Sequence, residues 1–241
     1  MLYLSRLELN PLNRKVMRDV SDCQDLHRTI LKGFPQTTSQ ANPRSSFNVL
    51  YRMEIGRNII IYVQSTIEPD WSYLLQEHYL LFSEQGNPAV KRIDEHLARI
   101  REGMVLRFRL LANPTRKVKT NNKIERLAGI KNNGKRLPIH SFEDQIGWLK
   151  TKGESGGFKL LSIKAAPDVS NVVCNGSNVT IGFRPKKVSI PDRKFDRLTF
   201  KGVIFEGYLE VSDRNQFLGT ITQGIGSGKA YGFGLLSVAG S

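Results

Sequence analysis

The chain is organised around a glycine-rich segment, Gly224-Ile225-Gly226-Ser227-Gly228-Lys229-Ala230-Tyr231-Gly232-Phe233-Gly234, followed by Leu235-Leu236-Ser237-Val238. Five glycines in eleven residues allow positive φ angles and a close approach of the backbone to a flat or anionic partner. Residues 213–221 before the stretch are typical of a helix, and residues 231–238 are typical of a strand. We therefore expect a glycine loop that leads into a closing strand, with Gly226, Gly228 and Lys229 as candidate phosphate contacts.

A nucleotide-binding P-loop is the first alternative, because Gly228-Lys229 matches the end of its pattern. The spacing disfavours it: Gln223 occupies the place of the required first glycine, and Ala230 stands where a magnesium-binding hydroxyl is needed. A P-loop also runs from a strand into a helix, which is the opposite order. The alternatives that remain are contact with a phosphate and a tight connection into a terminal strand.

The charge of the chain favours a polyanionic partner. Its 36 Lys and Arg residues against 22 Asp and Glu residues give a net charge of +14, and the excess is concentrated in residues 107–136 and 184–201. Such a surface attracts polyphosphate and gains free energy from released counterions. Nucleic acid is therefore the favoured partner, and a basic protein without such a role stays open. Binding to a membrane surface is disfavoured, because no stretch combines a long apolar face with a basic one.

The cysteines and the apolar runs indicate a protein of the cytoplasm. Cys23 and Cys174 are too few for a disulfide framework, and nothing near them has the spacing of zinc ligands. The longest clean apolar run, residues 59–63, is too short to cross a bilayer. Residues 1–4 continue into an alternating strand and do not resemble a signal peptide.

Hydrophobic periodicity predicts two similar halves within the 241 residues. In the first half, alternation predicts strands at 3–9, 47–53, 59–65 and 105–111. Ser21 and Gln24 form a capping box before a first helix, and a second helix is predicted from Val90, Ile93, Leu97 and Ile100. The resulting order β-α-β-β-α-β is that of a ferredoxin-like unit.

The second half repeats this plan more loosely after a polar linker at residues 115–138. The pattern predicts a helix at 141–152 and another from 213, and strands at 158–163, 179–190, 198–211 and 231–238. The predicted fold class is α+β, with two tandem ferredoxin-like domains at residues 1–115 and 116–241.

His27 is the best candidate for proton transfer. None of the four histidines has the pairing or the cysteine neighbours of a metal site, and no DxD cluster is present to hold magnesium. A metal-dependent nuclease is therefore disfavoured, whereas an RNA 2′-hydroxyl supplies its own nucleophile and needs only orientation, cations and proton exchange. Arg28 and Lys32 follow His27 within two turns of helix. The structural alternative is that His27 belongs to the buried stripe of this helix.

Two basic tracks are candidates for RNA contact. Arg184, Lys186 and Lys187 flank Pro185 and suggest the tip of a hairpin or a kinked strand, and a projecting basic element suits the shape and phosphates of an A-form stem. A second track consists of Lys117, Lys119, Lys123 and Arg126. For both tracks, the alternative is an ordinary solvated charge run.

With these residues in view, the chain resembles the CRISPR repeat-RNA endoribonucleases of the Cascade complex, in the RAMP superfamily. The similarity covers most of the chain, and it rests on the order and spacing of several short segments. These are Leu9-Asn10-Pro11, Leu26-His27-Arg28, Phe34-Pro35, Leu106-Arg107-Phe108-Arg109, Ala112-Asn113-Pro114, Gln145-Ile146-Gly147-Trp148-Leu149, Phe205-Glu206-Gly207 and Gly224 to Val238.

The resemblance implies tandem ferredoxin-like domains, no cofactor, and metal-independent cleavage of repeat RNA 3′ of its stem-loop to a 2′,3′-cyclic phosphate. It also implies that the product stays bound and that the partners are the repeat RNA and other Cascade subunits. The family's catalytic histidine falls on His27, and basic positions fall on Lys32 and Arg28. The chain departs from the family at Gln24, where a tyrosine is common. The alternative function is a non-catalytic RNA-binding subunit of the same superfamily.

Overall fold

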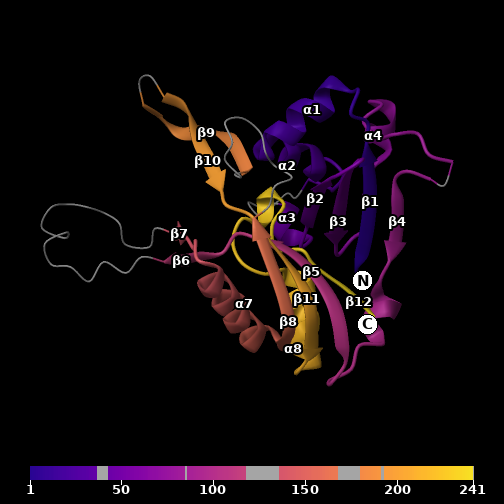
Figure 1. The fold of residues 1–241 in the computed structure, drawn as a ribbon. Helices are drawn as coiled ribbons and strands as arrows, with labels where there is room; N and C mark the ends of the chain where they lie inside the picture. Colours follow the sequence, from indigo (N-terminus) through magenta and orange to yellow (C-terminus); the bar gives the residue numbers. More distant parts are fainter. Residues whose placement is uncertain (37–42, 85, 118–135, 168–179, 191–192, 241) are drawn as a thin grey trace, which may run out of the picture.

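Two four-stranded antiparallel sheets form the frame of the protein in the computed structural model (Figure 1). The strand orders are β2-β3-β1-β4 and β12-β5-β11-β8. Both sheets carry helices, so the predicted α+β fold with two ferredoxin-like units is confirmed. The structure describes residues 1–36, 43–84, 86–117, 136–167, 180–190 and 193–240.

The first unit contains the first sheet and the helices that follow its strands in sequence. Its elements are β1 (Tyr3–Leu9), α1 (Arg14–Ser21), α2 (Cys23–Leu31), α3 (Pro43–Ser46), β2 (Leu50–Ile55), β3 (Ile59–Ser65), α4 (Ser72–Gln76) and β4 (Ala89–Arg92). Alternation along β1 buries Leu7 and Leu9 on one face, and Leu7 lies opposite Ile61 of β3. Together with Leu26 and Ile30 of α2, these residues belong to a single apolar core.

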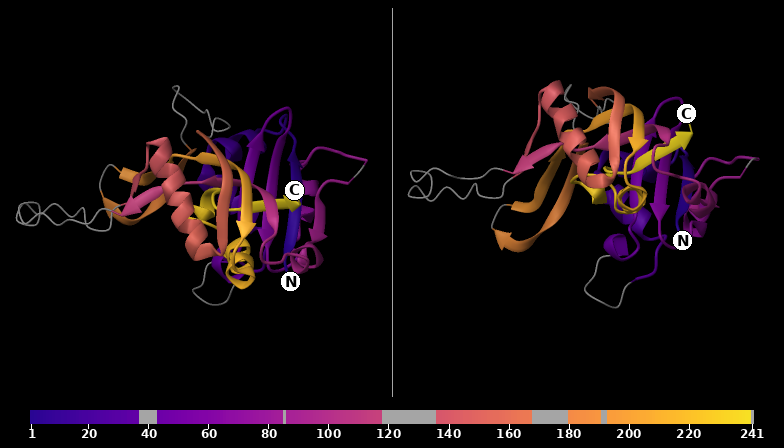
Figure 2. Two further views of the ribbon diagram at one scale, coloured as in Figure 1. Left: turned by 60° about the horizontal axis from the view of Figure 1, so that its bottom comes forward. Right: turned by 90° about the horizontal axis from the view of Figure 1, so that it is seen from below.

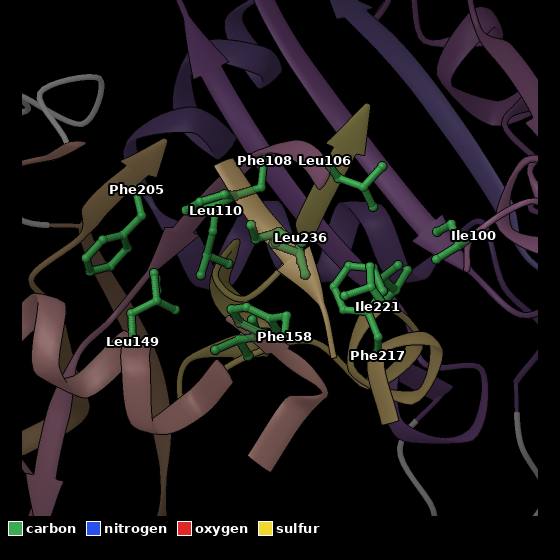
Figure 3. Packing of buried hydrophobic residues seen from close by; sticks show 14 of the residues in the cluster. Ile100, Leu106, Phe108, Leu110, Leu149, Phe158, Phe205, Phe217, Ile221 and Leu236 are labelled. Atoms are coloured by element: carbon green, nitrogen blue, oxygen red, sulfur yellow. The ribbon is translucent and has the colours of Figure 1, made fainter. Parts of the chain in front are cut away.

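The second unit repeats the strand order around its own core. After α5 (Asp94–Ala98) its elements are β5 (Val105–Ala112), α7 (Phe142–Gly156), β8 (Phe158–Pro167), β11 (Val203–Val211), α8 (Arg214–Gln223), the short 3₁₀ helix η1 (Lys229–Tyr231) and β12 (Leu236–Gly240). Figure 3 shows Leu149 of α7 and Phe217 and Ile221 of α8 packed towards the apolar side chains of the sheet. The second core therefore lies between these two helices and the sheet.

Two ribbons project from the second unit. They are β6 (Thr115–Lys117) with β7 (Arg136–Pro138), and β9 (Thr180–Ile190) with β10 (Arg193–Phe200). Figures 1 and 2 show both ribbons on the side of the molecule away from the two chain termini. No helix in the described ranges has the length and apolar character needed to cross a membrane.

Several predicted elements of the first half are corrected by the pairing of the strands. The strand predicted at 105–111 exists as β5, but it pairs with β11 and β12 in the second sheet, and the fourth strand of the first sheet is β4. Val90 therefore lies in a strand opposite Ser5, and not in a helix with Ile93, Leu97 and Ile100. The boundary predicted at residue 115 stays a prediction, and the sheet that contains β5 favours a boundary before Val105.

The helix boundaries near residue 22 also differ from the prediction. Residues 14–21, where the pattern predicts no helix, form α1, and Asn13 caps it by accepting hydrogen bonds from the backbone amides of Lys15 and Val16. Asp22, and not Ser21, is the N-cap of α2. In the second half, the strand predicted at 198–211 divides into β10 and β11, and the last strand begins at Leu236 because η1 occupies residues 229–231.

The glycine block, residues 224–234, connects the two units. The Tyr51 hydroxyl of β2 donates to the Ala230 carbonyl at 3.0 Å, and the Arg52 guanidinium donates to the Ser237 hydroxyl at 2.9 Å. The Gln64 amide of β3 donates to the Ile221 carbonyl at 2.8 Å. These hydrogen bonds join the first sheet to the glycine block and to the residues that flank it. They satisfy polar groups at the interface and fix the position of the block on the sheet.

Candidate functional site

Helix α2 carries His27 in a buried position that faces the second unit. The Asp22 carboxylate caps the helix by accepting from the backbone amides of Gln24 and Asp25 at 2.8 and 3.3 Å. The His27 side chain is 7% exposed, and Leu26 and Ile30 anchor the helix in the first core. The predicted stripe is therefore real, but His27 lies at its edge, next to residues of the glycine block.

A buried polar network supports α2 from behind. The Asp19 carboxylate of α1 is 1% exposed and accepts from Lys15 Nζ at 2.9 Å, from Thr29 Oγ1 at 2.6 Å and from the Tyr79 hydroxyl at 3.2 Å. The Tyr73 hydroxyl donates to the Thr29 carbonyl at 2.6 Å. Thr29 follows His27 by two residues, so this network fixes the part of the helix from which His27 projects.

The glycine block places Tyr231 directly beside His27. The two ring centroids are 5.7 Å apart with an interplanar angle of 59°. The Tyr231 hydroxyl donates to Gln24 Oε1 at 3.1 Å, and Phe200 at the end of β10 packs on the Tyr231 ring with centroids 5.0 Å apart. A tyrosine hydroxyl from the second unit thus reaches the position where the chain has Gln24.

The surroundings of His27 keep its imidazole neutral. Burial lowers the pKa of His27 from 6.5 to about 4, and the positive charges of Arg44 and Arg28 contribute to this lowering. The His27 Nδ1 atom is buried and has no hydrogen-bond partner among the described residues. Buried polar atoms of folded proteins are nearly always paired, so this atom marks a place where a ligand group would complete the site.

The two other predicted catalytic residues are less closely placed. Arg28 Nη1 forms an ion pair with Asp25 Oδ1 at 2.9 Å, and its charge acts on His27. Lys32 lies at the C-cap of α2, and its backbone amide bonds to the Thr29 carbonyl at 3.3 Å. The catalytic roles predicted for Arg28 and Lys32 stay predictions.

Sequence reasoning missed two residues at this site, Tyr231 and Arg44. Tyr231 lies inside the glycine block that the sequence singled out, but only the packing of that block on β2 brings it to His27. Arg44 lies in the short helix α3, and it is close enough to lower the pKa values of both His27 and Lys229. No periodicity or motif marks Arg44, because its role depends on a contact between distant segments.

The hairpin of β9 and β10 rests on the N-terminus of α2. The Phe183 amide donates to the two Asp22 carboxylate oxygens at 3.4 and 3.2 Å. A Cβ atom at Gly182 would lie 2.5 Å from Cys23 Sγ, so only glycine permits this approach. The basic run therefore begins at Arg184, the residue next to the contact between β9 and the N-terminus of the helix that carries His27.

Of the two positions predicted for this basic run, the tip of a hairpin and a strand, the structure has the strand. In the backbone register of the β9–β10 ladder, Arg184 lies opposite Asp196, so the run lies within a strand and not at the tip of a hairpin. Lys186 and Lys187 follow in the same strand. In the second predicted track, Lys117 is exposed at the end of β6. The other three members, Lys119, Lys123 and Arg126, lie outside the described residues. The RNA contacts of both tracks stay predictions.

Backbone geometry and packing both require glycine at two positions of the block. Gly226 has φ +85°, and a Cβ atom there would lie 3.0 Å from the Trp148 ring. Gly228 has φ +78°, and a Cβ atom there would lie 2.9 Å from the Phe233 ring. A side chain at either position would be strained as well as crowded. Contact of Gly226, Gly228 or Lys229 with RNA stays a prediction.

The side chains at this site could transfer a proton close to positively charged groups. Within the described ranges, no group of three or more His, Cys, Asp or Glu side chains could hold a metal ion. An imidazole, a phenol and the charges of Arg44 and Arg28 are brought together instead. Such a set suits a reaction in which a substrate supplies the nucleophile and the protein supplies protons and positive charge.

Known proteins resemble this chain over most or nearly all of its length. The family model described as "CRISPR associated protein" matches residues 2–240. The chain is 34% identical to the CRISPR-associated endoribonuclease Cse3 of Thermus thermophilus, over 99% of this chain and 100% of that protein. It is 27% identical to the CRISPR system Cascade subunit CasE of Escherichia coli, over 78% and 84% of the two chains. The structure of Thermus thermophilus Cse3 bound to an RNA representing a pre-cleavage complex superposes with a TM-score of 0.69 at 30% identity, covering 99% of this chain and 98% of that one.

Proposed function

The chain belongs to the CRISPR associated protein family, and on this premise we propose that it is the endoribonuclease that cuts CRISPR precursor RNA within each repeat. The cut lies 3′ of the stem-loop, and the enzyme stays bound to the product hairpin. Its protein partners are the other subunits of a Cascade complex, as the similarity to CasE suggests. The observation that carries the proposal is the buried His27 imidazole at the junction of the two units, whose Nδ1 atom has no partner in the described part of the chain.

We propose that the cleavage needs no metal ion. The 2′-hydroxyl upstream of the cut attacks the phosphorus atom, the bond from phosphorus to the 5′-oxygen breaks, and a 2′,3′-cyclic phosphate and a 5′-hydroxyl form. One proton leaves the 2′-hydroxyl and another reaches the departing 5′-oxygen. Arg44, together with Arg28 and Lys32 from α2, stabilises the charge on the phosphate.

His27 acts as the general acid once RNA is bound. In the free protein its pKa of about 4 leaves it neutral near pH 7. A scissile phosphate beside Arg44 and Arg28 offsets the charges that disfavour protonation, so it raises the pKa and allows His27 to carry a proton. The acid is therefore formed only in the complex, which confines proton delivery to bound substrate.

Tyr231 is proposed as the positioning residue of His27. Gln24 can form hydrogen bonds but cannot transfer a proton, and the Tyr231 hydroxyl is bonded to its Oε1 atom. The Tyr231 ring also shields the imidazole from water. Tyr231 thus supplies from the second unit the aromatic side chain that the first unit lacks at residue 24.

The basic strand of the hairpin is the proposed contact for the RNA stem. Arg184, Lys186 and Lys187 lie in β9, directly beyond the residue that bonds to the N-cap of the catalytic helix. Replacing all three with Ala should weaken RNA binding and reduce the slope of log K against log salt by about 0.9 for each phosphate that the protein no longer neutralises. An unchanged slope would remove this strand from the interface.

Incubation of the purified protein with repeat RNA in EDTA tests the function. Cleavage to a fragment with a 2′,3′-cyclic phosphate supports a metal-independent endoribonuclease. Cleavage that appears only after magnesium is restored overturns the metal-independent mechanism. Tight binding without a cut in either condition assigns the chain to the alternative, a non-catalytic RNA-binding subunit with the same fold.

A further inference from the structure

A polar cavity of about 280 Å³ lies beside the glycine block, and no residue of the first sheet is among the described residues that line it. Its walls come from the block, from α7, and from the β6–β7 ribbon. Three cations line it, each from a different element: Arg136 of β7, Lys152 of α7 and Lys229 of η1. Segments that are far apart in the sequence therefore converge on one small, positively charged space.

The lining of the cavity suits an anion. Hydroxyl groups of Thr115, Ser155, Thr220 and Ser227 lie among the cations. No acidic side chain is among the described residues that line it. In the described part of the chain, Lys152 and Lys229 have no ion-pair partner. Like charges that converge without a carboxylate repel one another, and a bound anion relieves that repulsion.

Lys229 links this cavity to His27. Burial lowers the pKa of Lys229, and the charges of Arg44 and Lys152 lower it further. Arg44 also acts on His27, so one cation lies within electrostatic reach of both places. Lys229 and Tyr231 are the two ends of η1, and Tyr231 contacts His27. The 3₁₀ helix η1 therefore carries a neighbour of His27 at one end and a cation of the cavity at the other.

The geometry disfavours a nucleobase in this space. Trp148 is the aromatic residue of the described lining, and its ring already packs on Phe205 with centroids 6.2 Å apart. The edge of the same ring lies against Gly226. The rest of the wall is mostly polar side chains and glycine backbone, which matches a phosphate better than the flat apolar face of a base.

We propose that this cavity is a subsite for one backbone phosphate of the bound RNA, near the phosphate that is cut. The proposal rests on the proposed function, because it assumes that RNA passes His27. Arg136, Lys152 and Lys229 hold the phosphodiester, and the subsite fixes the strand so that the scissile bond lies beside His27. Its ligand is a phosphodiester of the RNA strand, and a free inorganic phosphate is the other source of the same chemistry.

A methylphosphonate scan tests the subsite in the full-length protein. Repeat RNA with a 2′-deoxy nucleotide upstream of the cut binds without turnover, and a neutral methylphosphonate replaces each phosphodiester near the cut in turn. Affinities are measured for the wild type, for Lys152→Gln, and for Lys150→Gln. Lys150 is the matched control, because it is an exposed lysine of the same helix outside the cavity.

The expected result is one position at which the neutral linkage weakens wild-type binding about fivefold to tenfold, as the removal of one charge-assisted hydrogen bond would. At that position the Lys152→Gln protein, which keeps Arg136 and Lys229, should show a clearly smaller weakening than the wild type, whereas Lys150→Gln should behave like the wild type. The salt slope of Lys152→Gln should also fall by about 0.7, the value for one phosphate of a single strand.

Equal weakening in all three proteins at every position overturns the subsite. Inorganic phosphate that raises the melting temperature of the wild type but not of Lys152→Gln, without coupling in the scan, assigns the cavity to a small anion and also overturns the RNA subsite. Cleavage of unmodified RNA is measured in parallel. Intact cleavage without coupling refutes the subsite only, whereas no cleavage by any of the proteins refutes the proposed function.

Discussion

Helix α2 presents two buried polar side chains, Thr29 and His27, to two different surroundings. The Thr29 hydroxyl donates to Asp19 and accepts from Lys15, and the Thr29 carbonyl accepts from Tyr73. His27 is buried to nearly the same degree, yet its Nδ1 atom has no partner among the described residues. On one side of the helix the polar groups have their hydrogen bonds, and on the other side a buried nitrogen has no partner among the described residues.

Groups that stabilise the fold and groups left for a ligand lie on different sides of this one helix. A buried polar group without a hydrogen bond costs about 1–3 kcal/mol of folding free energy. The Asp19 network behind α2 offsets this cost locally, because it fixes the same turn of helix with several charge-assisted bonds. Substitutions on the two sides of α2 should therefore change different quantities, the cleavage rate on the His27 side and the free energy of unfolding on the Thr29 side.

The largest effect is expected for His27→Ala, which removes the proposed general acid. A general acid contributes about 10²- to 10⁴-fold to the rate, so cleavage of repeat RNA should slow by that factor. Binding should be nearly normal, because the phosphate contacts of the cations remain. Single-turnover cleavage and an equilibrium binding assay separate the two quantities.

A substrate with sulfur in place of the bridging 5′-oxygen tests whether the missing group is the acid. Its leaving group hardly needs a proton, so it should restore much of the rate that His27→Ala loses. A 2′-deoxy nucleotide upstream of the cut should abolish cleavage by either enzyme. If the mutant cuts the sulfur substrate no faster than the natural one, His27 is a base or an orienting residue.

The next largest effect is expected for Asp19→Ala, which removes the acceptor of the buried hydrogen-bond network behind α2. The change leaves Lys15 and the Thr29 hydroxyl without their buried partner, and breaking such a network costs about 3–5 kcal/mol of unfolding free energy. Asp25→Ala is the control, because its ion pair with Arg28 is exposed and should contribute less than about 1 kcal/mol. Denaturant unfolding measures both, and equal effects would contradict the division between the two sides.

A smaller effect is expected from the titration of His27. Its pKa in the folded state is about 4, and the ordinary value of 6.5 applies to the unfolded chain. Between these pH values the unfolded state binds the additional proton, so stability falls as pH drops from about 6.5 to about 4. The full shift amounts to about 3 kcal/mol. His27→Gln should lose less stability over this window, and parallel pH profiles for the two proteins would contradict the prediction.

Local patterns were sufficient to predict most elements but not the surroundings in which they lie. Alternation identified the strand that begins at Val105. It could not show to which sheet the strand belongs, because that depends on pairing with β11 and β12, which are distant in the sequence. Helix α1 was missed because its buried face includes Asp19, which hydropathy counts as a surface residue. Val90 matched a helical spacing by chance, and its pairing with Ser5 determines its conformation instead.

The candidate site divides in the same way. His27 was identified from the resemblance and from the chemistry of its side chain. Its burial, its low pKa and its neighbours Tyr231 and Arg44 arise from contacts between distant segments, which no periodicity encodes. The glycine block was recognised as special, but the sequence could not distinguish a phosphate loop from a packed connection. The structure shows glycines that the packing requires and, beside the block, a cavity lined by cations.

The smallest effect is expected at Tyr231, which borders the reactive side without belonging to α2. Its ring excludes water from His27, so Tyr231→Ala should restore solvent and raise the His27 pKa from about 4 towards 6.5. Tyr231→Phe keeps the ring and should leave that pKa near its wild-type value, so NMR titration of the imidazole separates shielding from hydrogen bonding.

Cleavage should slow about tenfold in Tyr231→Ala, because a loosely held imidazole is less often aligned with the leaving oxygen. In Tyr231→Phe cleavage should slow less, since only the bond to Gln24 is removed. If His27 titrates alike in all three proteins, Tyr231 does not shield it, and the low pKa must come from Arg44, Arg28 and the rest of the buried surroundings.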